Sequence, residues 1–507
     1  MRLERSKNAK TNLIFGLAYR AVAILFPFII RTLFIKIIGE QYLGLNSLFS
    51  SILQVLSMAE LGFNSAVVYN MYKPVADNDT DTICALLAFY RKVYRIIGCI
   101  IFGVGLLLIP FLPRLIKGTY PSDINLTVVY LISLTSTSLS YFMFAYLRSL
   151  ISAYQREDID SKNSLVVDTL FYLAQAAVIV LTKNYYIYAI LSPVFTVINN
   201  IRIARIIRRM FPDLECRGTL DRSIVQDIKT RIKGLLIQNV CNVSRNSFDS
   251  IFVSAFLGLT LTAVYNNYYY IINSITMVLV IVKSAVKAGV GNSIVTDSAE
   301  KNYSDMNRMN FGYMWISGWS TICLLCLFQP FMKIWMGEKL MLSMPAVILF
   351  CLYFYVLKMG DIRAVYADAN GLWWENRYRS ILEVICNISL NYLLGKYFGV
   401  IGIISATLIS LFFVNFLYGS TIVFKYYFTS QKISEYYLSH FGYLAVTAVI
   451  AGITYYICSL VHMSDWMTLI VRLVICALLP NIIYLGFYWA VPQTRESMKW
   501  LKVRISH

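Results

Sequence analysis

Charged residues are scarce in this 507-residue sequence, and it has no polar stretch long enough to form a soluble domain. Asp, Glu, Lys and Arg make up 14% of the chain and hydrophobic residues 58%, with a mean hydropathy of +0.62. Soluble domains have about 25% charged and 45–50% apolar residues. The charge falls in short islands between continuous apolar runs longer than the roughly 18 residues that a membrane-spanning helix needs. The sequence therefore predicts an all-α polytopic membrane protein, and excludes a cytosolic enzyme, a secreted disulfide scaffold, a disordered protein and an alternating outer-membrane barrel.

Motifs for nucleotide-driven or metal-dependent chemistry are also missing. No phosphate-cradling GxxxxGK[ST] motif occurs, so the chain is not its own ATPase. The ten cysteines follow no disulfide or zinc spacing, and we interpret Cys323 and Cys326, within TICLLCLF, as small core residues. The acidic pairs in residues 77–79 and 158–160 lie in short loops with no nucleotide-sugar-binding domain, so we interpret both as solvated loops. We expect a protein that is not an enzyme and that has no cofactor or metal.

Hydropathy predicts fourteen spans. They cover residues 12–37, 42–69, 93–112, 125–147, 164–182, 185–207, 234–257, 262–286, 310–330, 343–366, 378–397, 399–424, 439–460 and 466–490. When the Lys and Arg near a span end are counted with the adjoining segment, 34 of the 45 lie on the side of the N-terminus, 7 lie on the other side, and 4 lie deeper within spans. This asymmetry predicts that both termini are cytoplasmic. The net charge of +18 then reflects topology and contact with anionic lipid, not nucleic-acid binding.

The longest polar stretch divides the spans into two blocks. We predict an N-terminal lobe of six spans (1–210), a cytoplasmic amphipathic linker (211–233), a C-terminal lobe of six spans (234–425), and a final helix pair with a cytoplasmic tail (426–507). The amphipathic pattern from Ser223 to Lys233, in the latter part of the linker, predicts a surface helix. Because each six-span block starts in the cytoplasm, any internal repeat must be parallel.

Charged residues inside membrane spans are costly, so each is a candidate functional residue. Deep cations outnumber deep anions in the first twelve spans, and this surplus predicts a cationic cavity that selects an anion such as phosphate. The predicted substrate-binding residues are Arg20, Arg31, Arg245 and Lys283. Arg20 and Arg31 share one face of the first span, although snorkelling to the lipid surface is the alternative for Arg31.

A second group of polar residues in the spans is predicted to act in gating or ion coupling. Its members are Glu60, Asn64, Asp249, Asp361 and Arg363. Glu60 and Asn64 are four residues apart, as are Arg245 and Asp249, which can neutralise each other as a structural pair or as a gate. Arg472, in the last span, is expected to contact lipid or a partner.

Two segments resemble signature motifs of bacterial polysaccharide repeat-unit flippases. SILQVLSMAELGFNSAVVYNMYKPVADND resembles their AELG…A…Y.LYKPLA motif, and NSFDSIFVSAFLGLTLTAVYNNYYYI resembles their D…I..FLGL..V..YS.YY.I stretch. The matching positions are Glu60, Gly62, Tyr69, Pro74, Asp249, Gly258, Tyr265 and Tyr269, while Asn64 stands where a small Gly or Ser is expected. The resemblance covers essentially the whole chain. It implies a member of the multidrug/oligosaccharidyl-lipid/polysaccharide exporter superfamily, with two lobes around a cationic cavity.

The resemblance further implies a flippase in the bacterial inner membrane. It would carry an undecaprenyl-diphosphate-linked oligosaccharide from the inner to the outer leaflet, for O-antigen, capsule or teichoic acid. Membrane lipids, H⁺ or Na⁺, and a polysaccharide polymerase with its chain-length machinery are the candidate partners. A MATE-like exporter of cationic drugs is the alternative, but the positive surplus argues against it. An integral-membrane glycan polymerase or ligase is a third, and it is disfavoured because the outside loops, the longest near 113–124 and 331–342, are short.

Overall fold

The computed structural model describes residues 5–60 and 63–505, and within these residues every regular element is a helix. Ten described helices are long and apolar enough to cross a membrane, or eleven if the bent pair Leu126–Phe142 and Ala145–Ala153 is one span. One of the ten, Arg377–Tyr426, contains two of the predicted spans. The other two predicted spans are 42–69, where the helix is interrupted near residue 60, and 234–257, which is the second part of the helix Arg222–Leu257. The prediction of a polytopic all-α membrane protein is confirmed.

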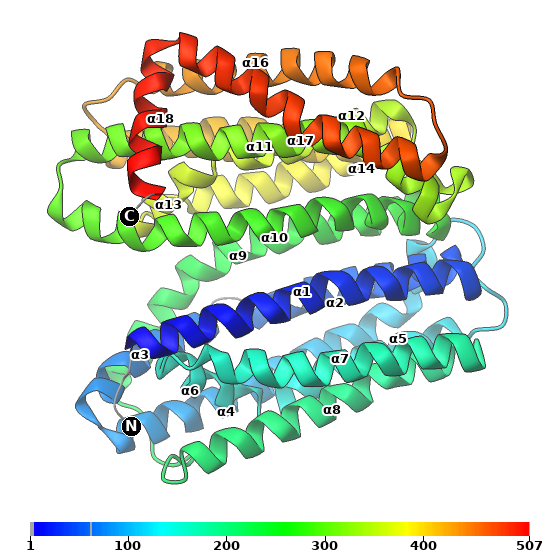
Figure 1. Ribbon diagram of the computed structural model, residues 1–507. Coiled ribbons are helices and arrows are strands. Elements are labelled where there is room, and N and C mark those ends of the chain that lie inside the picture. Colours follow the sequence, from blue (N-terminus) through cyan, green and yellow to red (C-terminus); the bar gives the residue numbers. More distant parts are fainter. Residues whose placement is uncertain (1–4, 61–62, 506–507) are drawn as a thin grey trace. The chain divides into compact units, whose positions relative to one another are not determined.

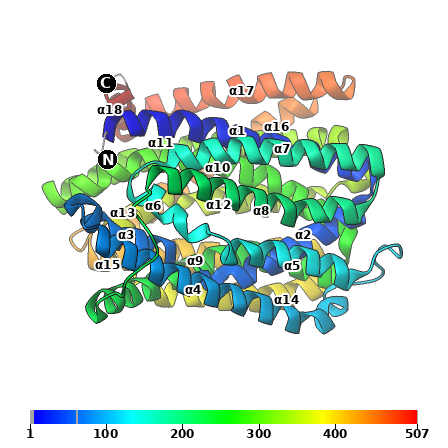
Figure 2. The same cartoon turned by 90° about the horizontal axis from the view of Figure 1, so that it is seen from below.

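The chain forms two compact units, Met1–Ala263 and Val264–His507. The helices of the first unit, labelled in Figure 1, are α1 (Arg5–Ile37), α2 (Glu40–Leu56), η1 (Ser57–Glu60), α3 (Phe63–Asp77), α4 (Thr80–Leu108), η2 (Ile109–Leu115), α5 (Leu126–Phe142), η3 (Ala145–Leu147), α6 (Arg148–Ala153), α7 (Glu157–Thr182), α8 (Tyr185–Met210) and α9 (Arg222–Leu257). In both views α7 lies between α1 and α8 (Figures 1 and 2), and α9 packs against α2 and α3.

Short polar side chains fix where the helices of the first unit begin. The Asn125 side chain accepts hydrogen bonds from the first backbone N–H groups of α5, and Asn184 does the same for α8. Gly44 allows the helix that begins at Leu259 to approach α2 closely. A Cβ at position 44 would overlap the carbonyl group of Leu259. Helix α5 packs against both α2 and α8, and all three helices line one space.

Two local predictions in the first unit were wrong in part. The second predicted span is not one regular helix: α2 ends at Leu56, a short 3₁₀ segment follows to Glu60, and α3 begins at Phe63. Glu60 and Asn64 therefore do not share a continuous helix face. The predicted amphipathic helix from Ser223 to Lys233 does form, with Ile228 and Ile232 buried and Ser223 and Lys229 exposed, but it is not separate, because it makes up the first turns of α9, which runs without a break to Leu257. Its apolar residue Ile228 is fully buried in the core, which explains why the segment packs as part of α9.

The helices of the second unit are α10 (Leu259–Thr296, whose first turn belongs to the first unit), α11 (Ala299–Met336), η4 (Glu338–Leu340), α12 (Met344–Met359), α13 (Asp361–Ala369), α14 (Arg377–Ile409), η5 (Ser410–Tyr418), α15 (Gly419–Tyr426), α16 (Ile433–Ser459), α17 (Asp465–Ala490) and α18 (Pro492–Ile505). Helix α11 is the centre of this unit and contacts α12, α16, α17 and α18. Figure 1 shows α16, α17 and α18 in orange to red.

A sharp turn at Gly399 divides α14 into two antiparallel halves. Gly399 has φ 60° and ψ −136°, which a residue with a Cβ rarely adopts. The second half folds back on the first, so that the Asn387 amide donates to the Thr407 hydroxyl over 2.9 Å. This turn separates the predicted spans 378–397 and 399–424.

Candidate functional site

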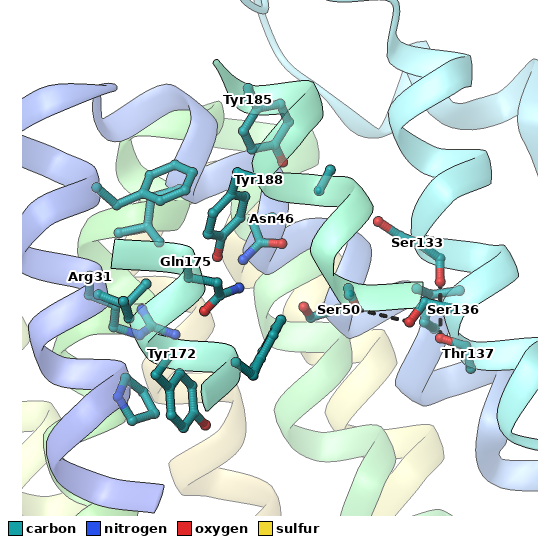
Figure 3. Close-up of a pocket in the computed structure, with 18 of the residues that line it drawn as sticks. Arg31, Asn46, Ser50, Ser133, Ser136, Thr137, Tyr172, Gln175, Tyr185 and Tyr188 are labelled. Carbon is teal, nitrogen blue, oxygen red and sulfur yellow. Dashed lines mark hydrogen bonds between the residues drawn. The ribbon is translucent and has the colours of Figure 1, made fainter. Parts of the chain in front are cut away.

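A cavity of about 440 Å³ lies within the first unit. Helices α1, α2, α5, α7 and α8 and the short segment η1 line it, so residues far apart in the sequence converge on one space. Figure 3 shows Arg31, Gln175 and Tyr188 pointing into this space from three different helices. We refer to it below as the Arg31 cavity.

Arg31 supplies the charge of this cavity. Among the described residues that line the cavity it alone is charged, and the other polar groups are neutral amides, hydroxyls and phenols. Its side chain is half-buried, which lowers the effective dielectric around the guanidinium and strengthens its attraction for an anion. The cavity is therefore cationic through a single residue.

The neutral lining combines aromatic rings with hydroxyl groups. Tyr172 stacks against Phe26, with ring centroids 5.6 Å apart, and Tyr188 packs edge-on against Phe34 at 4.8 Å. On the opposite wall, the hydroxyl oxygens of Ser136 and Ser192 are 2.8 Å apart (Figure 3). Flat rings and hydroxyl groups are surfaces on which a sugar can stack and hydrogen-bond, and the described part of the lining contributes no carboxylate.

Glu60 lies in a cluster of tyrosines next to this cavity. Its carboxylate accepts hydrogen bonds from the hydroxyls of Tyr94 and of Tyr141, the latter over 2.6 Å. Tyr90 lies 2.8 Å from the Tyr94 oxygen and 3.2 Å from the Asn64 amide oxygen. The two predicted coupling residues, Glu60 and Asn64, are thus joined through tyrosines of α4, not by helical spacing.

Ser57 connects the Glu60 cluster to the Arg31 cavity. It lines the cavity, and its side chain also hydrogen-bonds to Tyr141. Tyr141 lies on α5, the helix that contributes Ser136 to the cavity wall. Hydrogen bonds through Tyr141 and Ser57 therefore connect the Glu60 carboxylate to the cavity wall, so a change in the charge of Glu60 can affect the cavity.

The other predicted residues of the first unit lie apart from the cavity lining. Arg20 is exposed on α1, roughly three turns from Arg31. Arg245 and Asp249 are 7% and 3% exposed on α9, which touches the cavity wall where the Ser247 hydroxyl donates to the Gln54 side chain over 3.1 Å. Gly62, one of the positions that match the first motif, lies outside the described residues.

In the second unit the structure pairs two predicted residues with each other. The Lys283 ammonium lies 2.8 Å from the Asp361 carboxylate, which also accepts a hydrogen bond from Tyr313 at 2.6 Å. Lys358 approaches the same carboxylate at 3.6 Å. Lys283 was predicted as a substrate-binding cation and Asp361 as a gate, and here Lys283 forms an ion pair with a carboxylate that it shares with Lys358.

Arg363 lies at the centre of a buried polar cluster. The sequence indicated Arg363 itself, but not the polar residues around it. Arg363 is 4% exposed and packs against Gly419, where a Cβ would overlap its guanidinium. Next to it, Arg379 forms a 2.8 Å ion pair with Glu383, which also accepts a hydrogen bond from Asn415. Two guanidinium groups and one carboxylate thus meet in the interior, across the hairpin formed at Gly399. Such pairing depends on how that hairpin closes, so no local pattern predicts it.

One of the two acidic loops was misinterpreted. Residues 77 and 79 are exposed, as expected of a solvated loop, but Asp158 is 1% exposed. Its carboxylate is held by Arg156 at 2.8 Å and Lys162 at 2.9 Å. Asp158 is therefore the buried member of two ion pairs at the start of α7.

The fold and the cavity describe a multi-pass helical membrane protein with a polar binding space inside one unit. No family model matches the sequence, and no curated protein matches it either. Among solved structures, the lipid II flippase MurJ in its inward closed conformation is similar with a TM-score of 0.67 and 14% identity, over 94% of this chain and 99% of MurJ.

Two multidrug transporters of the MATE type are similar as well. An inward-facing MATE family transporter of the MOP superfamily has a TM-score of 0.59 and 13% identity, over 80% of this chain and 97% of its own. A point mutant of the Vibrio cholerae MATE transporter VcmN has a TM-score of 0.58 and 12% identity, over 85% of this chain and 99% of its own. The chain therefore has the fold shared by MurJ and MATE transporters.

Proposed function

We propose that the protein is a flippase that moves undecaprenyl-diphosphate-linked oligosaccharide repeat units from the cytoplasmic to the outer leaflet by alternating access. The observation that carries the proposal is the Arg31 cavity, with one guanidinium among hydroxyl, amide and aromatic groups. A guanidinium binds phosphate oxygens through paired N–H donors. Tyrosine faces and hydroxyl groups suit the sugars that follow the diphosphate. Similarity of fold to a lipid II flippase supports the same class of substrate.

Ion coupling fits the Glu60 cluster. The Glu60 carboxylate, which accepts hydrogen bonds from two tyrosine hydroxyls next to the cavity, can take up a proton or bind Na⁺. Ser57 links the cluster to the cavity wall. Binding of this ion would return the empty carrier to the state that accepts substrate. The same proposal includes the orientation with both termini in the cytoplasm, and a polysaccharide polymerase as the downstream partner.

The division into lobes 1–210 and 234–425, and the roles predicted for Arg20, Arg245, Asp249, Lys283, Asp361 and Arg363, belong to this proposal. Buried Arg245 and Asp249 on α9, the helix against the cavity wall, are placed to sense whether the cavity is occupied. Arg363 within its buried cluster and Lys283 with Asp361 are candidates for a gate in the second unit.

The test is outward movement of a labelled polyprenyl-diphosphate oligosaccharide in proteoliposomes containing the Arg31→Gln variant. Loss of one charge-assisted contact costs about 1.5–3 kcal/mol, which lowers affinity roughly ten- to hundredfold. We expect a fall of that size in the rate at subsaturating lipid, with partial rescue in Arg31→Lys.

Lys36→Gln is the matched control, because it removes an exposed cation from the same helix outside the cavity. Equal rates in the Arg31→Gln and Lys36→Gln variants would remove the basis of the proposal.

The second candidate is a MATE-like exporter of cationic drugs. Its support is the fold shared with MATE transporters and the Glu60 carboxylate close to the cavity. In that case Glu60→Gln should abolish export of a cationic dye, while Arg31→Gln should leave it intact or raise it.

A further inference from the structure

Four of the ten cysteines gather at one place in the second unit, although they are distant in sequence. Cys323 and Cys326 lie on α11, Cys458 lies near the end of α16, and Cys476 lies on α17. The sulfur atoms of Cys326, Cys458 and Cys476 all lie within 4.8 Å of one another. The Sγ atoms of Cys458 and Cys476 are 4.0 Å apart.

These three thiols are fully enclosed and form no disulfide. Their residues are 1%, 1% and 0% exposed, and all ten cysteines are free. Around them pack aromatic and aliphatic side chains, including Phe311 and Tyr484. Small apolar residues could fill this space equally well, so three thiols from three separate helices call for a reason beyond packing.

One basic side chain lies close to the thiols. Arg472, one turn before Cys476 on α17, interacts electrostatically with Cys458. The Nη2 of Arg472 approaches the Val461 carbonyl oxygen at 3.5 Å, and its buried Nε has no hydrogen-bond partner among the described residues. The Cys323 thiol, at 3.8 Å from the Cys476 carbonyl oxygen, is a fourth sulfur at the edge of the group.

We propose that Cys326, Cys458 and Cys476 bind a thiophilic d¹⁰ metal ion of the zinc type as thiolates, with Cys323 available as a fourth ligand. A zinc–sulfur bond is about 2.3 Å long, so tetrahedral ligation puts sulfur atoms roughly 3.8 Å apart. The observed 4.0 Å and the 4.8 Å limit need only small side-chain movements to reach this spacing. Binding releases the three thiol protons to the solvent.

The charges of such a site balance in a low-dielectric interior. Three thiolates and one divalent ion carry a net charge of −1, which the Arg472 guanidinium neutralises. A monovalent ion would leave −2 before that compensation, so the arrangement favours a divalent ion. Bound there, the metal would tie the α16–α17 pair to the central helix α11.

The test is the metal content of the full chain, purified in detergent under reducing conditions with an affinity tag that contains no histidine. After saturation with zinc and washing with a weak chelator, elemental analysis should find about one zinc ion per chain. Cys458→Ser and Cys476→Ser should lower this to the background level. Cys351→Ser is the matched control, because Cys351 is equally buried in the same unit but outside the cluster.

Cobalt substitution of the unmodified protein keeps the test valid if the serine variants do not fold. Thiolate ligation should give sulfur-to-cobalt charge-transfer absorption in the near ultraviolet. Absence of both zinc and this absorption in the unmodified protein would overturn the proposal. So would equal zinc retention in all variants, or a disulfide between Cys458 and Cys476 in the reduced preparation.

Discussion

The hydrogen bond between Tyr141 and Glu60 should be one of the strongest single polar contacts in the first unit. The two oxygens are 2.6 Å apart, Tyr141 is 6% exposed and the acceptor is a carboxylate. Hydrogen bonds to charged groups contribute about 1.5–3 kcal/mol in soluble proteins. Measured couplings inside membrane proteins average about 0.6 and reach about 1.7 kcal/mol. We therefore expect a coupling free energy of about 1–2 kcal/mol for this pair.

A double-mutant cycle with Glu60→Ala and Tyr141→Phe measures that coupling in the free energy of unfolding. Reversible unfolding in mixed micelles of detergent and SDS, followed by tryptophan fluorescence, is a suitable assay. The control cycle combines Glu60→Ala with Tyr130→Phe. Tyr130 lies on the same helix, α5, but donates to the Gly105 carbonyl oxygen at 3.2 Å. That control pair should be additive within about 0.5 kcal/mol, and a Tyr141 cycle no larger than the control would refute the reasoning.

Three further predictions concern charge, driving force and packing. If Arg245 and Asp249 only neutralise each other, replacing both with neutral residues should restore the transport lost in either single variant; if Arg245 also contacts diphosphate, the double variant should remain inactive. Transport should rise with a potential negative on the cytoplasmic side, because moving each negative charge outward gains about 2.3 kcal/mol per 100 mV; strict dependence on a pH or Na⁺ gradient instead would contradict this. Gly44→Ala should lower the free energy of unfolding by about 1–3 kcal/mol, because its Cβ overlaps the Leu259 carbonyl. Gly16→Ala, with no described atom within 4 Å of the new Cβ, should not, and equal thermal midpoints for these two variants would show that the contact is absent.

Features that depend on hydropathy along the chain could be predicted from the sequence. Each predicted span lies on a helix or on an interrupted helix, and the boundary placed between residues 397 and 399 coincides with the turn at Gly399. Prediction failed where tertiary packing overrode local pattern. Segment 223–233 forms the predicted amphipathic helix and buries its apolar residue Ile228, but the sequence did not indicate that this helix continues into the next span as α9.

The candidate site could be predicted in its charged members but not in their partners. Arg31 and Glu60 stand out because charge in a span is rare. The tyrosines that hold Glu60 come from α4 and α5, and nothing in their spacing points to a carboxylate 34 or 81 residues away. The cysteine cluster was missed for the same reason, since its members on three helices show no ligand spacing in sequence.

The most direct test of the proposed function compares two cargoes in proteoliposomes of the unmodified protein. One is a fluorescent polyprenyl-diphosphate oligosaccharide, whose arrival in the opposite leaflet is detected with a membrane-impermeant quencher or lectin. The other is a cationic dye under an imposed proton gradient. We expect the lipid-linked oligosaccharide to cross faster than in empty liposomes, and the dye to remain in place. Export of the dye with no acceleration of the lipid would contradict the flippase proposal and favour the multidrug exporter.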